Sequence, residues 1–326
     1  MERLGLEAGG AVDAEAFEKL MRHETPSGKS MVRRYASHGK VAAFDHTFSA
    51  PKSVSLLYAF GDERVRAEVT AAHQRAVAEG LSYMEEHCSQ SRLATKHKDE
   101  TGHWRVTTRT LESEGYLAAA FDHFTSRAND PQVHTHVVVI NRVWAGEGWR
   151  AIDAKRAYAH AKAGGSVYQA VLRDELTRRL GVEWQPVVNG QADLAGVSPE
   201  LVRHFSTRRA EIAEAVNRYL AERGGEAHRR VWQSFALETR QPKSHPGGEA
   251  AVTREMKDYG VTAAVIAHWN RRGQDAPEDV VGVVRSVVGE GRRRLQPTAA
   301  QIETAATSLV EWVSDRQAVF TERDLV

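Results

Sequence analysis

The sequence has little of several features that mark whole classes of protein. It contains one cysteine, Cys88, so no disulfide can form within the chain, and a reducing cytoplasm is the expected setting. No apolar run approaches the roughly 20 residues that span a bilayer. The N-terminal MERLGLEAGG also lacks the basic start and apolar centre of a secretory signal. These absences predict a cytoplasmic protein without membrane insertion.

Net charge and phosphate-binding signatures are also scarce. The 326 residues carry a formal charge of +1, so bulk electrostatics does not indicate a nucleic-acid partner. Each short basic cluster is, taken singly, more typical of a solvated helix face. These clusters are Arg208 with Arg209, Arg229 with Arg230, and Arg292 to Arg294. The GKS that ends at Ser30 resembles the end of a phosphate loop, but His23 stands where the first glycine of that loop belongs.

What the sequence does contain is a histidine-rich stretch from Phe121 to Asn141, FDHFTSRANDPQVHTHVVVIN. His134 and His136 precede a run of Val and Ile that predicts a strand, in which residues two apart share a face. GYLAAAFDHF upstream also predicts a strand, and the turn formers of NDP join the two. Antiparallel pairing would bring His123 beside the other two imidazoles. Three such rings suit a divalent metal with positions left open for substrate, although a His-x-His pair also occurs often by chance.

A second segment of interest runs from Val41 to Phe60. VAAFDHTFS predicts a strand in which the carboxylate of Asp45 is expensive unless it is paired. Asp45 could orient one of the histidines or accept a proton, and an exposed strand position explains it about as well. Lys52, a candidate phosphate contact, and Ser53 then open VSLLYAF, which we expect to form another strand. Further along, long helices are predicted from residue 62 to 88 and from 154 to 180.

Together, DHTFSAPKSVSL and, about seventy residues later, FDHFTSRANDPQVHTHVVVIN resemble conjugative relaxases of the MobF class, the TrwC/TraI type. These belong to the HUH endonucleases, named for two histidines around an apolar residue, where this chain has Thr135. The resemblance covers most of residues 1–245. It implies an α+β fold, a central antiparallel sheet packed with helices, here with a helical C-terminal extension.

The resemblance also implies a reaction and its residues. A tyrosine hydroxyl attacks a phosphodiester of single-stranded plasmid DNA at an origin of transfer, and the enzyme nicks and later religates that strand during conjugation. His123, His134 and His136 would hold a divalent cation such as Mg or Mn, and Asp45 would be the assisting catalytic carboxylate. Partners would be the origin DNA and other relaxosome and conjugation proteins.

One departure from the family concerns the nucleophile. The family keeps its tyrosines upstream of the segment that resembles LGLEAGGAVDAEAFEKL, which here begins near Arg3, so we expect the tyrosine segment to be missing. Tyr35 is the only tyrosine before Asp45, and we expect it to be structural. The chain would then be a fragment or a product with a late start.

Domain boundaries follow from composition. Two prolines and two glycines in QPKSHPGG, residues 241–248, predict a relaxase domain over 1–245 and a helical linker region over 246–297. Residues 298–326 resemble the entry into a helicase-like domain.

Two alternatives stay open. One is a non-catalytic module that binds single-stranded origin DNA through Lys52, Arg127 and backbone donors, with a vestigial metal site. The other is a metal-dependent oxygenase of β-barrel type, against which the long helices argue.

Overall fold

A computed structural model covers residues 1–326, and the structure describes all of them except 1, 33–40, 225–227, 239–260, 290–297 and 315–326. Helices and strands are mixed, as expected of an α+β protein. The predicted linker start at 241–248, the tail from 317 and Tyr35 lie outside the described residues. In the described part of the chain, no helix is both long and apolar enough to cross a bilayer.

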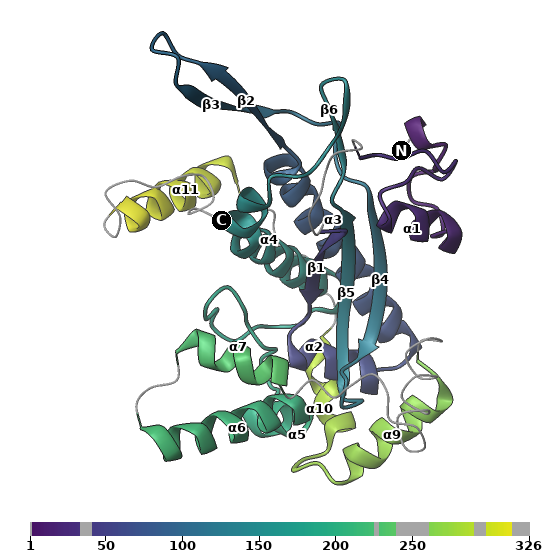
Figure 1. The fold of residues 1–326 in the computed structure, drawn as a ribbon. Helices are drawn as coiled ribbons and strands as arrows, with labels where there is room; N and C mark the ends of the chain where they lie inside the picture. The colour runs from purple at the N-terminus through teal and green to yellow at the C-terminus, as the bar shows by residue number, and fades with distance from the viewer. Residues whose placement is uncertain (1, 33–40, 225–227, 239–260, 290–297, 315–326) are drawn as a thin grey trace.

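The central sheet has three antiparallel strands (Figure 1). Strand β5 (Pro131–Ile140) lies in the middle, between β1 (Ala43–Ser49) and β4 (Ala118–Thr125). Side chains of β5 alternate between buried and half-buried, because one face meets helices and the other opens toward solvent. The predicted pairing of the two histidine-bearing strands is confirmed.

Two long helices cover the buried face of the sheet. Helix α3 (Glu63–Cys88) is capped by Asp62, and α4 (Ala154–Leu180) ends at Gly181 in the left-handed conformation, with φ 64°. The two helices approach closely at two glycines. A Cβ on Gly80 would lie 2.7 Å from the Phe48 ring, and one on Gly164 would lie 2.7 Å from the Met84 sulfur. This close approach seats both helices directly behind β1 and β5.

The segment expected to be a strand after Lys52 is instead helix α2 (Lys52–Phe60), so that prediction was wrong. Pro51 precedes the helix, Gly61 ends it, and every side chain from Ser53 to Ala59 is buried. A short run that is apolar on all sides fits a buried strand or a buried helix equally well, so periodicity could not separate the two. Its hydroxyl groups reach backbone and side-chain partners, as when Ser55 Oγ donates to the Pro51 carbonyl at 3.2 Å.

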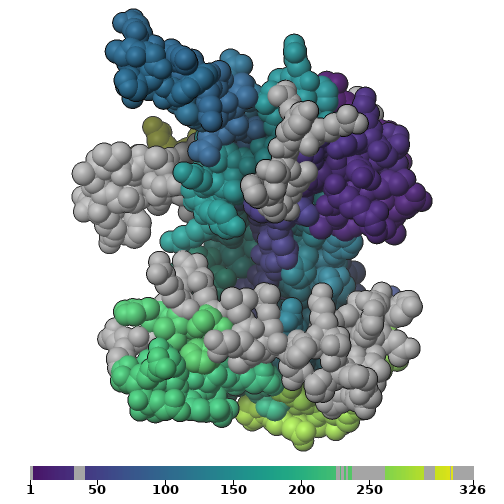
Figure 2. Space-filling model, viewed as in Figure 1, coloured from purple at the N-terminus to yellow at the C-terminus, as the bar shows by residue number. Residues whose placement is uncertain are grey.

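Two hairpins extend from this body. Strands β2 (Ser91–Lys98) and β3 (Trp104–Leu111) form a two-stranded ribbon that projects from the molecule (Figures 1 and 2). A shorter hairpin pairs β6 (Val143–Ala145) with β7 (Gly148–Arg150). The ribbon is exposed on both faces for most of its length, so packing against the core does not account for its side chains.

The remaining elements are helical and surround the lower and outer parts of the molecule. They are η1 (Glu2–Leu4), α1 (Ala14–Met21), α5 (Pro199–His204), α6 (Thr207–Arg223), α7 (Arg229–Glu238), α9 (Ala263–Gln274), α10 (Val280–Val287) and α11 (Ala299–Ser314). The predicted helical C-terminal extension is therefore confirmed. Helices α9 and α10 are more than a linker, however, because Trp269 and Val284 are buried in the same core as α2 and α3.

Candidate metal centre

Strand register brings the three predicted histidines together on the open face of the sheet. His123 on β4 pairs directly with His134 on β5, and His136 follows two residues later on the same face. The ring centroids are 5.2 Å apart for His123 and His134, 5.3 Å for His123 and His136, and 5.2 Å for His134 and His136. Helix α1 flanks this face, where Phe17 meets Phe121 with ring centroids 5.5 Å apart.

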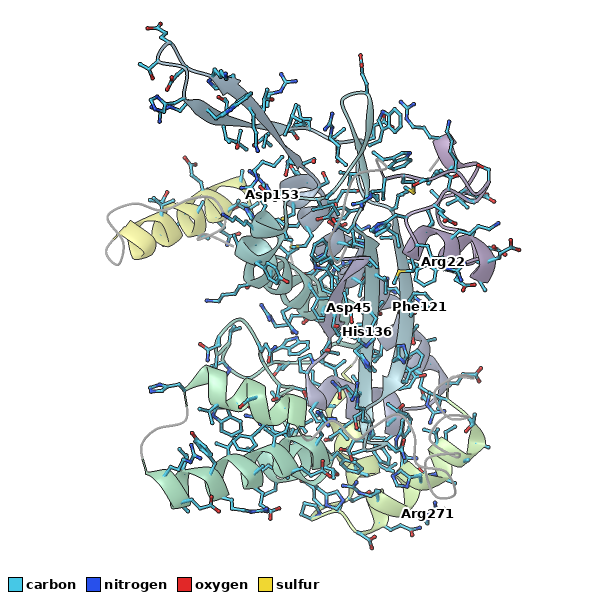
Figure 3. All side chains as sticks on the ribbon, in the orientation of Figure 1. Arg22, Asp45, Phe121, His136, Asp153 and Arg271 are labelled. Atoms are coloured by element: carbon cyan, nitrogen blue, oxygen red, sulfur yellow. The ribbon has the colours of Figure 1, made fainter. Side chains whose placement is uncertain are left out.

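Two of the imidazoles are held through Nδ1. His136 Nδ1 donates to the Asp45 carboxylate at 2.8 Å and 2.9 Å, and His134 Nδ1 donates to the Gln132 carbonyl at 3.0 Å. Figure 3 shows Asp45 and His136 side by side, with Phe121 on the neighbouring strand. Since Nδ1 carries the proton in each neutral ring, Nε2 carries the lone pair that binds a metal. Carboxylate and carbonyl partners of this kind are typical of metal-bound histidines.

The chemistry of this donor set fits a divalent cation. Three imidazoles that bind one ion tetrahedrally through bonds of about 2.0–2.1 Å have ring centroids roughly 5 Å apart, the spacing found in this cluster. Within the described ranges, however, no three His, Cys, Asp or Glu side chains already converge on one point as metal ligands. The rings are therefore gathered at a suitable distance, and their nitrogens have to turn toward a common point for coordination.

A series of hydrogen-bonded polar side chains, buried except at Asp122, lies on the opposite face of the same strands. Thr135 Oγ1 donates to Asp122 at 2.5 Å and contacts His73 Nε2 at 2.8 Å, and His73 Nδ1 contacts the Tyr168 hydroxyl at 2.9 Å. Burial lowers the pKa of His73 to about 4, against a smaller opposing effect of Asp122. Sequence reasoning assigned His73 no role, because nothing near residue 73 signals a partner 62 residues away.

The family model of the TrwC relaxases matches residues 1–261. The chain belongs to the TrwC relaxase family. It is also 30% identical over 336 residues to the multifunctional conjugation protein TraI of Escherichia coli, an alignment that covers 100% of this chain and 17% of TraI. The chain therefore spans about a sixth of the length of that relative.

Solved relaxase structures agree with this membership. Conjugative relaxase TrwC in complex with oriT DNA, in a metal-bound structure, has a TM-score of 0.64 and 29% identity, with 86% of this chain and 87% of that chain covered. TrwC complexed with a 27-mer DNA that comprises the recognition hairpin and the cleavage site gives a TM-score of 0.63 and 29% identity, covering 86% and 90%. These likenesses confirm the predicted MobF relaxase fold, and they fit the α+β class expected from sequence.

The two predicted DNA contacts lie at the end of the β4–β5 hairpin where the two strands are joined. Lys52 is at the start of α2, where its ammonium donates to the Pro131 carbonyl at 2.6 Å and burial lowers its pKa to about 8. Arg127 is exposed in the turn that joins β4 to β5. Phosphate binding by either residue stays a prediction, and Lys52 would have to leave its carbonyl partner to reach DNA.

The β2–β3 ribbon is a basic surface that sequence reasoning missed. On one face, Lys96 pairs across the strands with Val106, and Lys98 pairs with Trp104. Trp104 is 67% exposed. The Lys98 ammonium lies 5.4 Å from the Trp104 ring centroid. Arg105 and Arg109 project from the other face. The available signal was that charged and polar residues occupy alternate and adjacent positions of SRLATKHK and WRVTTRTL, so neither strand has a continuous apolar face for a core.

Proposed function

We propose that this chain is a relaxase domain that nicks and rejoins single-stranded DNA at an origin of transfer. The observation that carries the proposal is the cluster of His123, His134 and His136, held by Asp45 and Gln132 on an open face of a relaxase fold. The DNA-bound TrwC relatives support the substrate class. In this proposal the domain acts in the cytoplasm with the other proteins of conjugation.

His123, His134 and His136 would hold the metal through one nitrogen each. When bound, a divalent ion supplies positive charge to the non-bridging oxygens of a phosphodiester while negative charge builds up on them. Imidazole ligands favour borderline first-row ions such as those of nickel, copper and zinc over magnesium. Metal-bound TrwC supports the presence of an ion but not its identity in this chain.

Asp45 orients the site in this proposal. Its carboxylate accepts hydrogen bonds from His136 Nδ1 and, at 3.3 Å, from the Thr47 hydroxyl, so both oxygens serve neighbouring side chains. A carboxylate in this position keeps the ring in the Nδ1–H tautomer and raises the basicity of Nε2. Of the two roles considered from sequence, the hydrogen bonds support orientation over proton transfer.

The proposed reaction is a transesterification. The oxygen of a tyrosine hydroxyl forms a bond to phosphorus, the bond from phosphorus to the 3′ oxygen breaks, and the 3′ oxygen leaves with a proton. The protein stays attached to the 5′ phosphate, which conserves the bond for rejoining by the reverse steps. The resemblance places this tyrosine before Arg3, and Tyr35 lies outside the described residues.

DNA would reach the site along the basic ribbon. A two-stranded ribbon fits the major groove of a duplex, and lysines beside an exposed tryptophan also suit single strands through charge and base stacking. Lys96, Lys98 and Trp104 supply these groups on one exposed face. TrwC complexed with DNA that includes a recognition hairpin supports a duplex segment next to the cleaved strand.

The test is covalent adduct formation on a labelled origin oligonucleotide with Mn²⁺, read on a denaturing gel. A shifted protein–DNA band that is lost in His134→Ala, together with Ni²⁺ binding by calorimetry that is also lost in that variant, supports the proposal. Asp45→Asn should keep the fold and weaken Ni²⁺ binding by about tenfold. Salt-sensitive DNA binding with neither an adduct nor Ni²⁺ binding would instead favour the non-catalytic DNA-binding module with a vestigial metal site. Unchanged Ni²⁺ affinity in His134→Ala would refute the triad.

A further inference from the structure

The middle residue of the His-x-His pair connects the metal face to the core. Thr135 lies between His134 and His136, and alternation along β5 turns its side chain to the opposite face. There its hydroxyl is buried between Asp122 on β4 and His73 on α3. A buried hydroxyl needs hydrogen-bond partners, and the fold supplies them from the neighbouring strand and from α3.

The hydrogen bonds that link Tyr168, His73, Thr135 and Asp122 all donate in the same direction, toward Asp122. A carboxylate accepts, so the Thr135 hydroxyl donates to Asp122 Oδ1 at 2.5 Å. Thr135 Oγ1 must then accept from His73 Nε2 at 2.8 Å, which places the proton of the neutral ring on Nε2. His73 Nδ1 therefore accepts from the Tyr168 hydroxyl at 2.9 Å. Gln74 completes the chain by donating to Asp122 Oδ2 at 3.1 Å.

Asp122 and Thr135, which these hydrogen bonds hold in place, are immediate neighbours of the proposed metal-site histidines in the sequence. Asp122 and Thr135 are a register pair of β4 and β5, and the adjacent register pair is His123 with His134. A shift of Asp122 or Thr135 therefore moves the backbone from which these imidazoles project. Helices α3 and α4 pack closely at Gly80 and Gly164, so the positions of His73 and Tyr168 relative to the strands are well defined.

We propose that His73, acting through the Thr135 hydroxyl, is a positioning residue for the metal-binding imidazoles of this relaxase. This inference rests on the proposed function. It adds a hydrogen-bonded support on the buried face of the sheet to Asp45 and Gln132, which hold the imidazoles on the open face. Thr135, His73 and Tyr168 are buried, so a displacement of any of them leaves a buried donor or acceptor without a partner, and these hydrogen bonds favour one arrangement. An apolar side chain at position 135 would fill the same space, but it would make no hydrogen bonds that fix the orientation of β5 relative to α3.

Substitutions at Thr135 isolate the hydroxyl. Thr135→Val keeps the shape and removes the hydrogen bonds, and Thr135→Ser keeps the hydroxyl. Thr177→Val is the matched control, because it makes the same change on α4, where Thr177 Oγ1 accepts from Trp184 Nε1 at 3.0 Å. Ni²⁺ affinity is measured by calorimetry, and the Cu²⁺-loaded proteins are compared by electron paramagnetic resonance. Thermal melts by circular dichroism confirm that each variant is folded at the assay temperature.

The expected result is an affinity loss of about tenfold in Thr135→Val, the lower end of what an orienting partner contributes. Its Cu²⁺ spectrum should change, while Thr135→Ser and Thr177→Val stay close to the unmodified chain. Equal affinity and an equal spectrum in Thr135→Val and Thr177→Val would overturn the positioning role and leave the triad intact. If the unmodified chain binds neither ion, the proposed function itself fails, and this inference fails with it.

Discussion

Hydrogen-bond direction decides what each histidine of this protein can do. His134 and His136 donate through Nδ1 to a carbonyl and to a carboxylate, which leaves the Nε2 lone pair for the proposed metal. His73 has the opposite tautomer and is enclosed between Thr135 and Tyr168. Histidines therefore have different hydrogen-bonding roles on the two faces of the sheet: His134 and His136 are partly open to solvent, whereas His73 is buried.

Burial of His73 predicts a pH dependence of stability. Its pKa falls to about 4 in the folded state from the ordinary histidine value of 6.5, because burial disfavours the charged ring. Asp122 opposes that shift and His134 adds to it, while the Tyr168 hydroxyl faces Nδ1. Between these two values the unfolded chain binds a proton that the folded chain does not, so the free energy of unfolding falls as pH falls. The pKa difference amounts to roughly 3 kcal/mol.

Urea unfolding at pH 7, 5.5 and 4.5 measures this contribution. His73→Gln cannot titrate, so its stability should fall less across that range than the stability of the unmodified protein. His97→Gln is the control, because His97 is exposed on the β2–β3 ribbon. Parallel curves for His73→Gln and the unmodified chain would show that burial of His73 does not govern this dependence.

Sequence patterns reveal residues that act through local spacing and miss those that act through distant contacts. The triad was predictable because a His-x-His pair in a Val-rich strand shares one face, and a turn returns His123 to it. The partner of His73 depends on how α3 lies across β5, which local periodicity does not encode. Lys52 shows the same limit, since its carbonyl partner Pro131 is 79 residues away.

Elements differ in how far their own sequence determines them. Helix α3 has a capping aspartate and an apolar stripe, and it formed where expected. Helix α2 is buried on all sides, so its pattern lacks the polar face that distinguishes a helix from a strand. The β2–β3 ribbon alternates as a strand pair does yet is exposed over most of its length, so packing against the core does not explain its side chains, in keeping with the proposed role in DNA binding.

The ribbon predicts a specific salt dependence of DNA binding. Each phosphate contact by a lysine releases counterions, so removal of two such contacts should lower the slope of log affinity against log salt by about 2. The double variant Lys96→Ala and Lys98→Ala tests this by fluorescence anisotropy on a labelled hairpin with a single-stranded extension. Arg218→Ala with Arg223→Ala is the control, because α6 lies at the other end of the molecule from the ribbon (Figure 1). Equal slopes in both double variants would exclude the ribbon as a phosphate-binding surface.

The whole molecule joins its C-terminal helices to the strands that carry the histidines. In the turn between β4 and β5, the buried carboxylate of Asp130 accepts from Arg272 Nη1 at 2.9 Å and from Thr207 N at 2.8 Å. Trp269 Nε1 donates to the Asn129 carbonyl at 2.9 Å in the same turn. Helix α9 thus holds the turn of the hairpin, close to the register pair of His123 and His134, although the family match ends at residue 261.

Truncation separates the helices that the core needs from the one that it does not. A chain that ends at residue 261 loses four buried side chains, Val265, Trp269, Val280 and Val284, each 3% exposed or less. Burial of one such side chain contributes roughly 1.5–3 kcal/mol, so their joint loss is comparable to the whole stability of a domain. We expect no cooperative thermal transition for this chain. A longer truncated chain, which ends at Gly289, keeps α9 and α10. It also keeps the hydrogen bond from Gly289 N to the Leu180 carbonyl at 3.0 Å. It loses α11, whose described side chains are exposed. Its melting temperature should stay within a few degrees of that of the full chain. Cooperative melting of the shorter chain at the same temperature would show that the fold and its histidine cluster are complete without α9 and α10.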